Sequence, residues 1–174
     1  MEILVLIKQV PDDSVEIKLD PATGAPKLDG VEAVVNAFDT YALEMAKRYI
    51  EDNGGNVTVA TIGDDDATAA LRTCLAVGAG KAFLIKDASF AGSDTTAKAY
   101  ILSKAVAKIE EINGAKFDII FCGKEATDFS KGMVGVQLAS ELGVGVATDV
   151  IAVNPAHFVL MFAAEAADQI LFVF

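Results

Sequence analysis

The feature that most constrains the fold is the alternation of short, mostly apolar runs with longer amphipathic stretches. Apolar runs at residues 3–7, 56–62, 81–85 and 117–122 are typical of strands buried on both faces of a sheet, and residues 149–153 form a weaker candidate. Amphipathic stretches near residues 38–53, 65–77, 93–113 and 130–142 carry apolar residues at helical spacing. This alternation predicts right-handed crossovers and a doubly wound α/β fold, with a mostly parallel sheet and helices on both faces.

Residues 11–35 interrupt the alternation. Three prolines and two glycines separate short alternating pieces there, so we expect a small hairpin excursion after the first strand and not a separate domain. The length of 174 residues favours one α/β domain, which we assign to residues 1–153. Residues 154–174 have no clear assignment. Their apolar end, Leu171 to Phe174, indicates either a truncated chain or burial against a partner.

Charge and composition exclude several classes of function. The chain has 14 basic and 25 acidic residues, a net charge of −11, which disfavours binding to nucleic acid or to an anionic membrane. Its single histidine, His157, argues against a histidine-based metal site or a catalytic triad. The uncharged residues 150–164 are too few for a membrane span, and the first residues lack a basic secretory signal. With only Cys74 and Cys122, we expect a cytoplasmic protein.

A candidate phosphate-binding turn follows the run at residues 117–122. Ligands of doubly wound sheets bind beyond the carboxyl ends of the strands, near the switch in strand order. The turn at residues 123–135 carries Lys131, and Gly132 and Gly135 would allow a nucleotide to approach the backbone closely. Main-chain N–H groups at the following helix start could hold a phosphate. No strict glycine fingerprint is present, so an ordinary capped loop with solvated lysines stays open from the spacing alone.

Several segments together resemble the electron-transfer flavoprotein β subunit family. They are residues 3–12 (ILVLIKQVPD), 20–24 (DPATG), 36–44 (NAFDTYALE), 76–79 (AVGA), 92–95 (GSDT) and 122–128 (CGKEATD). Each segment is short, but their order and spacing over residues 1–150 make the resemblance specific.

The resemblance implies a Rossmann-like domain that binds an adenine nucleotide and pairs with an α subunit in a heterodimer. The two subunits carry FAD and shuttle electrons between flavin dehydrogenases, such as an acyl-CoA dehydrogenase, and a downstream oxidoreductase. In ordinary members the β subunit holds AMP, and in electron-bifurcating members a second FAD takes that place. Carried onto this chain, the family's nucleotide contacts fall at Leu6, Asn36, Ala37, Phe38, Asp39, Ile62, Ala126, Thr127, Asp128, Phe129, Ser130, Lys131, Gly132, Met133, Val134, Gly135, Val136 and Gln137.

The chain also departs from the family pattern. Ala37 replaces the usual proline, and Lys131 and Met133 stand where members usually have a hydroxyl and an amide donor. The resemblance implies an electron carrier subunit. Because no convincing nucleophile or acid–base set is present, we expect this subunit to have no catalytic residues of its own and no metal site. The alternative is an ATP-binding regulatory domain of universal-stress type, which has a similar fold. Its usual Gly-x-x-Gly-x-(Ser/Thr) loop is not evident here.

Overall fold

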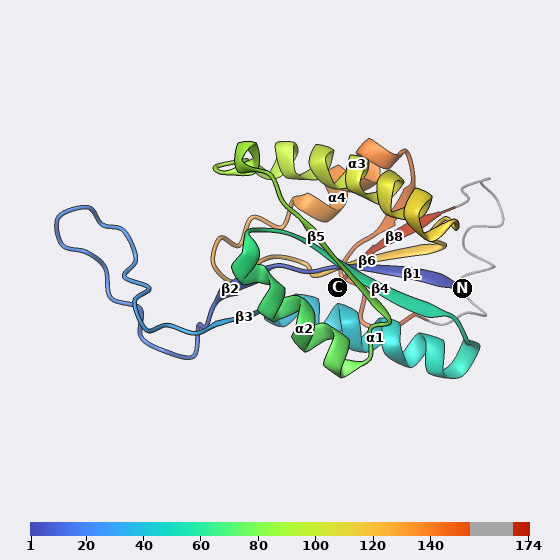
Figure 1. The fold of residues 1–174 in the computed structure, drawn as a ribbon, viewed down its shortest axis with the longest axis horizontal. Helices are drawn as coiled ribbons and strands as arrows, with labels where there is room; N and C mark the ends of the chain where they lie inside the picture. The colour runs from blue at the N-terminus through green and yellow to red at the C-terminus, as the bar shows by residue number, and fades with distance from the viewer. Residues whose placement is uncertain (154–168) are drawn as a thin grey trace.

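A six-stranded parallel sheet forms the centre of the molecule (Figure 1). The computed structural model describes residues 1–153 and 169–174. The strands are β1 (Glu2–Leu6), β4 (Asn56–Ile62), β5 (Lys81–Ile85), β6 (Ile119–Cys122), β7 (Gly145–Ala147) and β8 (Ile170–Val173). Their order across the sheet is β5-β4-β1-β6-β8-β7, and every neighbouring pair is parallel.

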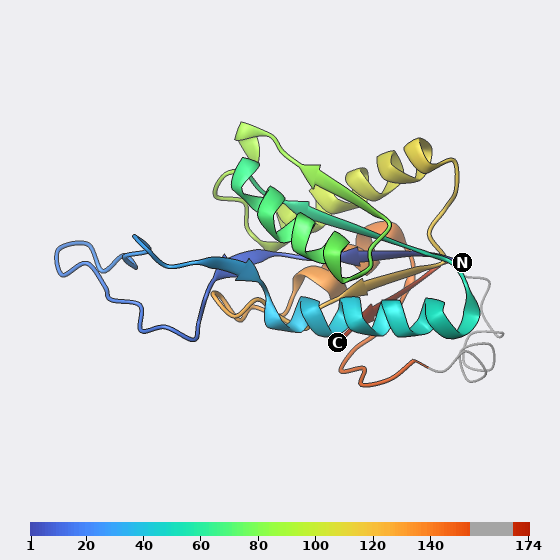
Figure 2. The same cartoon turned by 60° about the horizontal axis from the view of Figure 1, so that its bottom comes forward.

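Helices cover both faces of the sheet (Figures 1 and 2). On one face lie α1 (Ala37–Asn53) and α2 (Thr68–Val77), and on the other lie α3 (Thr95–Asn113) and α4 (Val134–Leu142). Short 3-10 turns, η1 (Asp65–Ala67) and η2 (Ala88–Phe90), precede α2 and α3. Along β1, Ile3 and Val5 pack against the first pair of helices, while Leu4 and Leu6 pack against the second. Burial on both faces explains the continuous apolar run at residues 3–7. The predicted doubly wound α/β fold is confirmed.

The strand order reverses beside β1. After β1 the chain adds β4 and then β5 on one side of β1. It then crosses the sheet and forms β6 on the other side of β1. The switch point of the sheet therefore lies between β1 and β6. In sheets of this kind the loops leaving two such strands diverge and open a crevice at the carboxyl edge.

The predicted hairpin after the first strand is also confirmed. It consists of β2 (Gln9–Pro11) and β3 (Ala33–Val35), paired antiparallel, and it begins at Gln9, slightly before the predicted residue 11. The connecting residues 12–32, called the arm below, project well away from the sheet and helices (Figures 1 and 2).

The weak strand predicted at residues 149–153 and the predicted start of the fourth helix are both wrong, for a local backbone reason. Residues 149–153 form no strand, since Asp149 takes the left-handed conformation with φ 54° and breaks an extended run. The fourth helix begins at Val134 and not near residue 130, because Ser130 (φ 44°) and Gly132 (φ 61°) are left-handed and cannot continue a right-handed helix.

The apolar residues near the C-terminus lie inside the sheet. All four residues of β8 are buried between β6 and β7, and the main-chain N–H of Phe174 donates to the Cys122 carbonyl oxygen (2.9 Å). This chain's own elements therefore cover a segment for which the sequence suggested truncation or a partner. His157 lies outside the described residues. Within residues 1–153 and 169–174, no helix has both the length and the apolar character needed to cross a membrane.

Candidate functional site

A cavity of about 830 Å³ lies at the carboxyl ends of β1, β4 and β6, between the first turns of α3 and α4. This place is the crevice that the switch in strand order predicts. Its volume falls within the roughly 300–1,000 Å³ typical of small-molecule sites. Leu6, Ile62 and Leu102 supply an apolar wall, whereas loops and helix starts supply the polar groups.

The start of α4 offers unpaired main-chain donors to this cavity. Met133 occupies the N-cap position, and no side chain caps the helix. The N–H groups of Phe129 and Ser130 both donate to the Ala126 carbonyl oxygen. From Lys131 through Val136, however, the main-chain N–H groups find no acceptor among the described residues. A run of free N–H groups at a helix N-terminus, where the helix dipole is positive, suits an anionic group.

Lysine side chains surround the cavity, but not all of them are free. Those that line it are Lys8, Lys98, Lys124 and Lys131. Lys8 Nζ forms an ion pair with both carboxylate oxygens of Asp128 (2.6 Å), and Lys124 pairs with Asp149, which raises the pKa of that lysine. In the described part of the chain, Lys98 and Lys131 form no ion pair, so their charges are available to a ligand.

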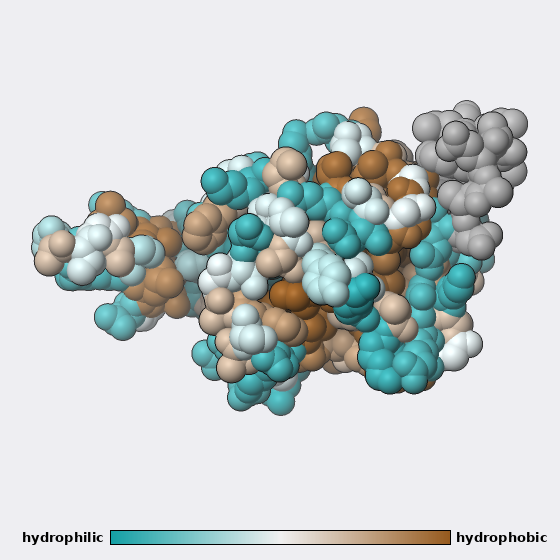
Figure 3. Space-filling view, turned by 90° about the horizontal axis from the view of Figure 1, so that it is seen from above, coloured by the Kyte–Doolittle hydropathy of each residue, from teal (hydrophilic) through white to brown (hydrophobic). Residues whose placement is uncertain are grey.

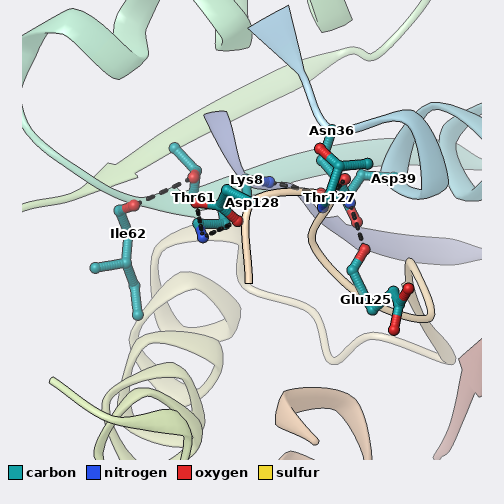
Figure 4. A network of polar contacts seen from close by, with 8 residues as sticks. All are labelled: Lys8, Asn36, Asp39, Thr61, Ile62, Glu125, Thr127 and Asp128. Atoms are coloured by element: carbon teal, nitrogen blue, oxygen red, sulfur yellow. Dashed lines mark hydrogen bonds and ion pairs between the residues drawn. The ribbon is translucent and has the colours of Figure 1, made fainter. Parts of the chain in front are cut away.

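Asn36 clamps the loop after β6 to the start of α1 (Figure 4). It occupies the N-cap position of α1, yet its side chain does not cap the helix. Instead its Nδ2 donates to the Glu125 carbonyl oxygen (2.8 Å), and its Oδ1 accepts from the Thr127 N–H (3.1 Å). Because Asn36 is only 1% exposed, the two hydrogen bonds are shielded from water and hold the loop in place.

Asp39 joins the two sides of the switch point, and Figure 4 shows its contact with Lys8 on the β1 side. Its Oδ2 accepts from the Lys8 main-chain N–H (2.7 Å) after β1, and its Oδ1 accepts from the Gly123 N–H (3.1 Å) after β6. Burial raises the pKa of Asp39 to about 7, while the two N–H groups and the Lys8 charge act in the opposite direction. A β-carbon at Gly123 would overlap Asp39, so a glycine is required for this close approach.

The structure brings together eleven of the predicted site residues around the cavity. They are Leu6, Asn36, Asp39, Ile62, Ala126, Phe129, Lys131, Gly132, Met133, Val134 and Gly135. The seven that do not line it are Ala37, Phe38, Thr127, Asp128, Ser130, Val136 and Gln137. The hydrogen bonds of Asn36 and Asp39 go to main-chain groups, so both residues shape the cavity. Direct contact with a nucleotide stays a prediction for every residue of the set.

Sequence reasoning missed the contribution of α3. Ser93, Asp94, Thr95 and Lys98 line the cavity beside Gly92, although the segment at residues 92–95 was noted only as part of a family pattern. The Asp94 side chain caps α3 by accepting from the Ala97 N–H (2.8 Å). The predicted topology could have placed the start of α3 at the cavity, because every helix that follows a parallel strand starts at the carboxyl edge of the sheet.

Gly135 has a packing role in addition to its place at the cavity. A β-carbon there would lie 2.9 Å from Val173 Cγ2 and 3.5 Å from Cys122 Cβ. The absence of a side chain therefore lets α4 lie close to β8 and β6. Gly132, by contrast, supplies a left-handed turn (φ 61°) that leads the chain into the helix.

The chain is similar to known electron-transfer proteins. The electron transfer flavoprotein domain family matches residues 27–169. The chain is 46% identical over 144 residues to electron transfer flavoprotein subunit beta of Thermoanaerobacterium thermosaccharolyticum, covering 83% of this chain and 53% of that protein. It is 44% identical over 144 residues to Protein FixA of Azorhizobium caulinodans, covering 83% of this chain and 50% of that protein.

A third relative is named as part of a larger assembly. This is the caffeyl-CoA reductase-Etf complex subunit CarD of Acetobacterium woodii, 39% identical over 149 residues, with 85% of this chain and 55% of that protein covered. The chain thus spans about half the length of these curated relatives. The family match over most of the chain, the level of identity and the confirmed α/β fold agree. The chain belongs to the electron-transfer flavoprotein β subunit family.

Proposed function

We propose that this chain binds an adenine nucleotide, AMP or FAD, in the cavity at the switch point and works as the β subunit of an electron-transfer flavoprotein. It pairs with an α subunit and shuttles electrons between a flavin dehydrogenase, such as an acyl-CoA dehydrogenase, and a downstream oxidoreductase. The flavin supplies the redox chemistry, and the protein supplies position and electrostatics. Family membership makes the universal-stress alternative unnecessary. The acidic composition and sparse cysteines favour a cytoplasmic location.

The observation that carries this proposal is the run of main-chain N–H groups from Lys131 to Val136, which have no acceptor in the described part of the chain. Residues 131–135 of this run line the cavity, and the Lys131 ammonium forms no ion pair within residues 1–153 and 169–174. This end of the cavity therefore suits a phosphate. The buried carboxyl of Asp39 lies at the other polar end, beside the strands. The N–H groups and the Lys131 ammonium at α4 attract phosphate, so the nucleotide binds with its phosphate toward α4 and its adenine against the apolar wall.

The names of the relatives support the proposed partners. The term "subunit beta" describes a protein that works with another subunit, and the Acetobacterium relative is named as part of a complex with a CoA-ester reductase. A chain of the same family is expected to make comparable associations.

The test is nucleotide retention in a charge-reversal variant. We expect Lys131→Glu to weaken nucleotide binding about 10- to 100-fold, since a charge-assisted hydrogen bond is lost and a carboxylate is placed beside the phosphate. The matched control is Lys116→Glu, an exposed lysine just before β6, at the opposite edge of the sheet. The nucleotide is extracted from the purified α–β complex, identified by mass and counted per chain.

Each result of this experiment has a defined meaning. AMP or FAD in the wild-type complex, reduced in Lys131→Glu and retained in the control, supports the proposal and identifies the nucleotide. A wild-type complex that contains neither adenine nucleotide nor flavin refutes it. Full retention in the Lys131→Glu complex refutes the assignment of the phosphate to the start of α4.

A further inference from the structure

The arm, residues 12–32, has no hydrophobic core of its own. None of its residues is buried, and it stands away from the sheet and helices in both ribbon views (Figures 1 and 2). An isolated two-stranded hairpin is only marginally stable in water, because ordering the backbone costs conformational entropy that burial must offset. An arm of this length is therefore expected to be covered by another surface when the protein works.

The arm nevertheless has a defined backbone conformation. At its tip, Asp20 Oδ1 accepts from the N–H groups of Ala22 (2.9 Å) and Thr23 (3.1 Å). Further back, the Lys27 N–H donates to the Lys18 carbonyl oxygen (2.8 Å) and Leu19 bridges to Pro26. These local bonds fix the shape of the arm before any partner is present, and such preorganisation lowers the cost of binding.

Three apolar side chains are exposed on this scaffold. Leu19 is 64% exposed, Val15 46% and Leu28 43%. Apolar patches are visible among the hydrophilic atoms of the arm in the space-filling view (Figure 3). Apolar side chains gathered on a segment without a core are typical of an interaction surface.

The charge of the arm indicates what kind of surface it meets. The arm holds six acidic residues (Asp12, Asp13, Glu16, Asp20, Asp29 and Glu32) and two basic ones (Lys18 and Lys27), a net charge of −4. Among the described residues only Asp20 of this acidic set forms an ion pair, with Lys27 (3.4 Å). The complementary surface is therefore basic. A second copy of this chain, with a net charge of −11, would be repelled.

The base of the arm is connected to the nucleotide cavity. The Asn36 N–H donates to the Lys8 carbonyl oxygen (2.9 Å), which closes the hairpin next to β2 and β3. Both residues line the cavity. A protein that contacts the base of the arm consequently lies near the cavity, as a partner sharing in electron transfer has to do.

We propose that the arm docks this chain onto the second subunit of its flavoprotein. Val15, Leu19 and Leu28 enter an apolar depression on that subunit, and lysine and arginine side chains around the depression face the carboxylates of the arm. This inference rests on the proposed function, because it assigns the arm to the partner proposed there.

The first test replaces the apolar side chains of the arm together, as Val15→Gln, Leu19→Gln and Leu28→Gln. The matched control replaces three exposed residues on helices: Tyr41→Gln, Leu75→Gln and Ile112→Gln. The affinity for the purified α subunit is measured by calorimetry, together with the nucleotide content and the melting temperature of each variant. We expect at least a hundredfold loss of affinity for the arm variant, since buried apolar anchors dominate binding, and less than a threefold change for the control.

Nucleotide content and melting temperature separate docking from folding. We expect both to be unchanged in the arm variant. An arm variant that binds the α subunit as tightly as the wild type overturns the docking proposal and leaves the proposed function standing. If the wild-type chain does not bind the α subunit, both the proposed pairing and the docking proposal are refuted. The wild-type measurement alone distinguishes this outcome from a failure of the docking proposal.

The second test addresses the charge of the arm with Asp13→Asn, Glu16→Gln and Asp29→Asn. The control neutralises exposed acidic residues elsewhere: Asp52→Asn, Asp66→Asn and Glu141→Gln. We expect about tenfold slower association and a weaker salt dependence for the arm variant only, because complementary charges mainly accelerate association. Equal effects in both sets would show a response to net charge and overturn the basic docking surface.

Discussion

Replacing Asp39 by asparagine would show how the buried carboxyl at the switch point depends on pH. Asparagine has nearly the same shape, but it cannot ionise. In the wild-type protein the carboxyl is 6% exposed, and burial raises its pKa from 3.8 to about 7. The folded protein therefore keeps the proton on Asp39 at pH values where the unfolded chain has released it.

The sign and size of the effect follow from this difference in pKa. A carboxyl whose pKa is higher in the folded state contributes stability at low pH, and this contribution is lost as the pH rises to the folded pKa. Between pH 5 and pH 7 the unfolded chain is ionised, and the folded chain becomes half ionised only at pH 7. Since one pKa unit corresponds to about 1.4 kcal/mol, the free energy of unfolding falls by roughly 2 kcal/mol over this interval.

The assay is urea-induced unfolding of the wild type and Asp39→Asn at pH 5, 6, 7 and 8. Taking the difference between the two proteins cancels every other titrating group. We expect the stability of the wild type relative to the variant to fall by roughly 3 kcal/mol from pH 5 to pH 8 and to level off above pH 7. Asp52→Asn, an exposed substitution, should show no such trend. A difference that stays constant for Asp39→Asn would refute the raised pKa.

Three further substitutions test the packing and the loop clamp. Gly135→Ala places a β-carbon 2.9 Å from Val173 Cγ2 and should lower the free energy of unfolding by about 1–3 kcal/mol. If Gly135→Ala costs the same amount in a protein that already carries Val173→Ala, this contact is not the cause. Leu171→Ala, at a fully buried position of β8, should cost about 2–5 kcal/mol, and a negligible loss would contradict the place of β8 in the sheet. Asn36→Ala leaves Thr127 N–H without its partner and should weaken nucleotide binding at least tenfold by calorimetry; unchanged affinity would contradict the clamp.

The strands near the centre of the sheet could be predicted because their burial leaves a local mark. A strand such as β1, covered by helices on both faces, is apolar at nearly every position, and the run at residues 3–7 reflects this. The place of β8 between β6 and β7 leaves no such mark. It depends on pairing with strands far away in the sequence, so residues 171–174 could be identified only as apolar residues that need a cover.

Residue identities at the candidate site were easier to predict than the contacts they make. Asn36 was expected at the site and lines the cavity, but its hydrogen-bond partners Glu125 and Thr127 are 89 and 91 positions away in the sequence. No local pattern reports contacts over such a separation. The start of α4 was misplaced for a related reason, because a left-handed Ser130 is uncommon for a residue with a side chain and cannot be recognised from its identity.

The position of β8 has a consequence for how the protein folds. β7 forms its ladder with β8 and not with β6, although it follows β6 and α4 directly in the chain. Until β8 inserts, β6 has an open apolar edge of Ile119–Cys122, and β7 has no neighbour. Such an edge can pair with the same edge of another molecule. Refolding is therefore expected to be slow at this step, and the yield should fall as protein concentration rises.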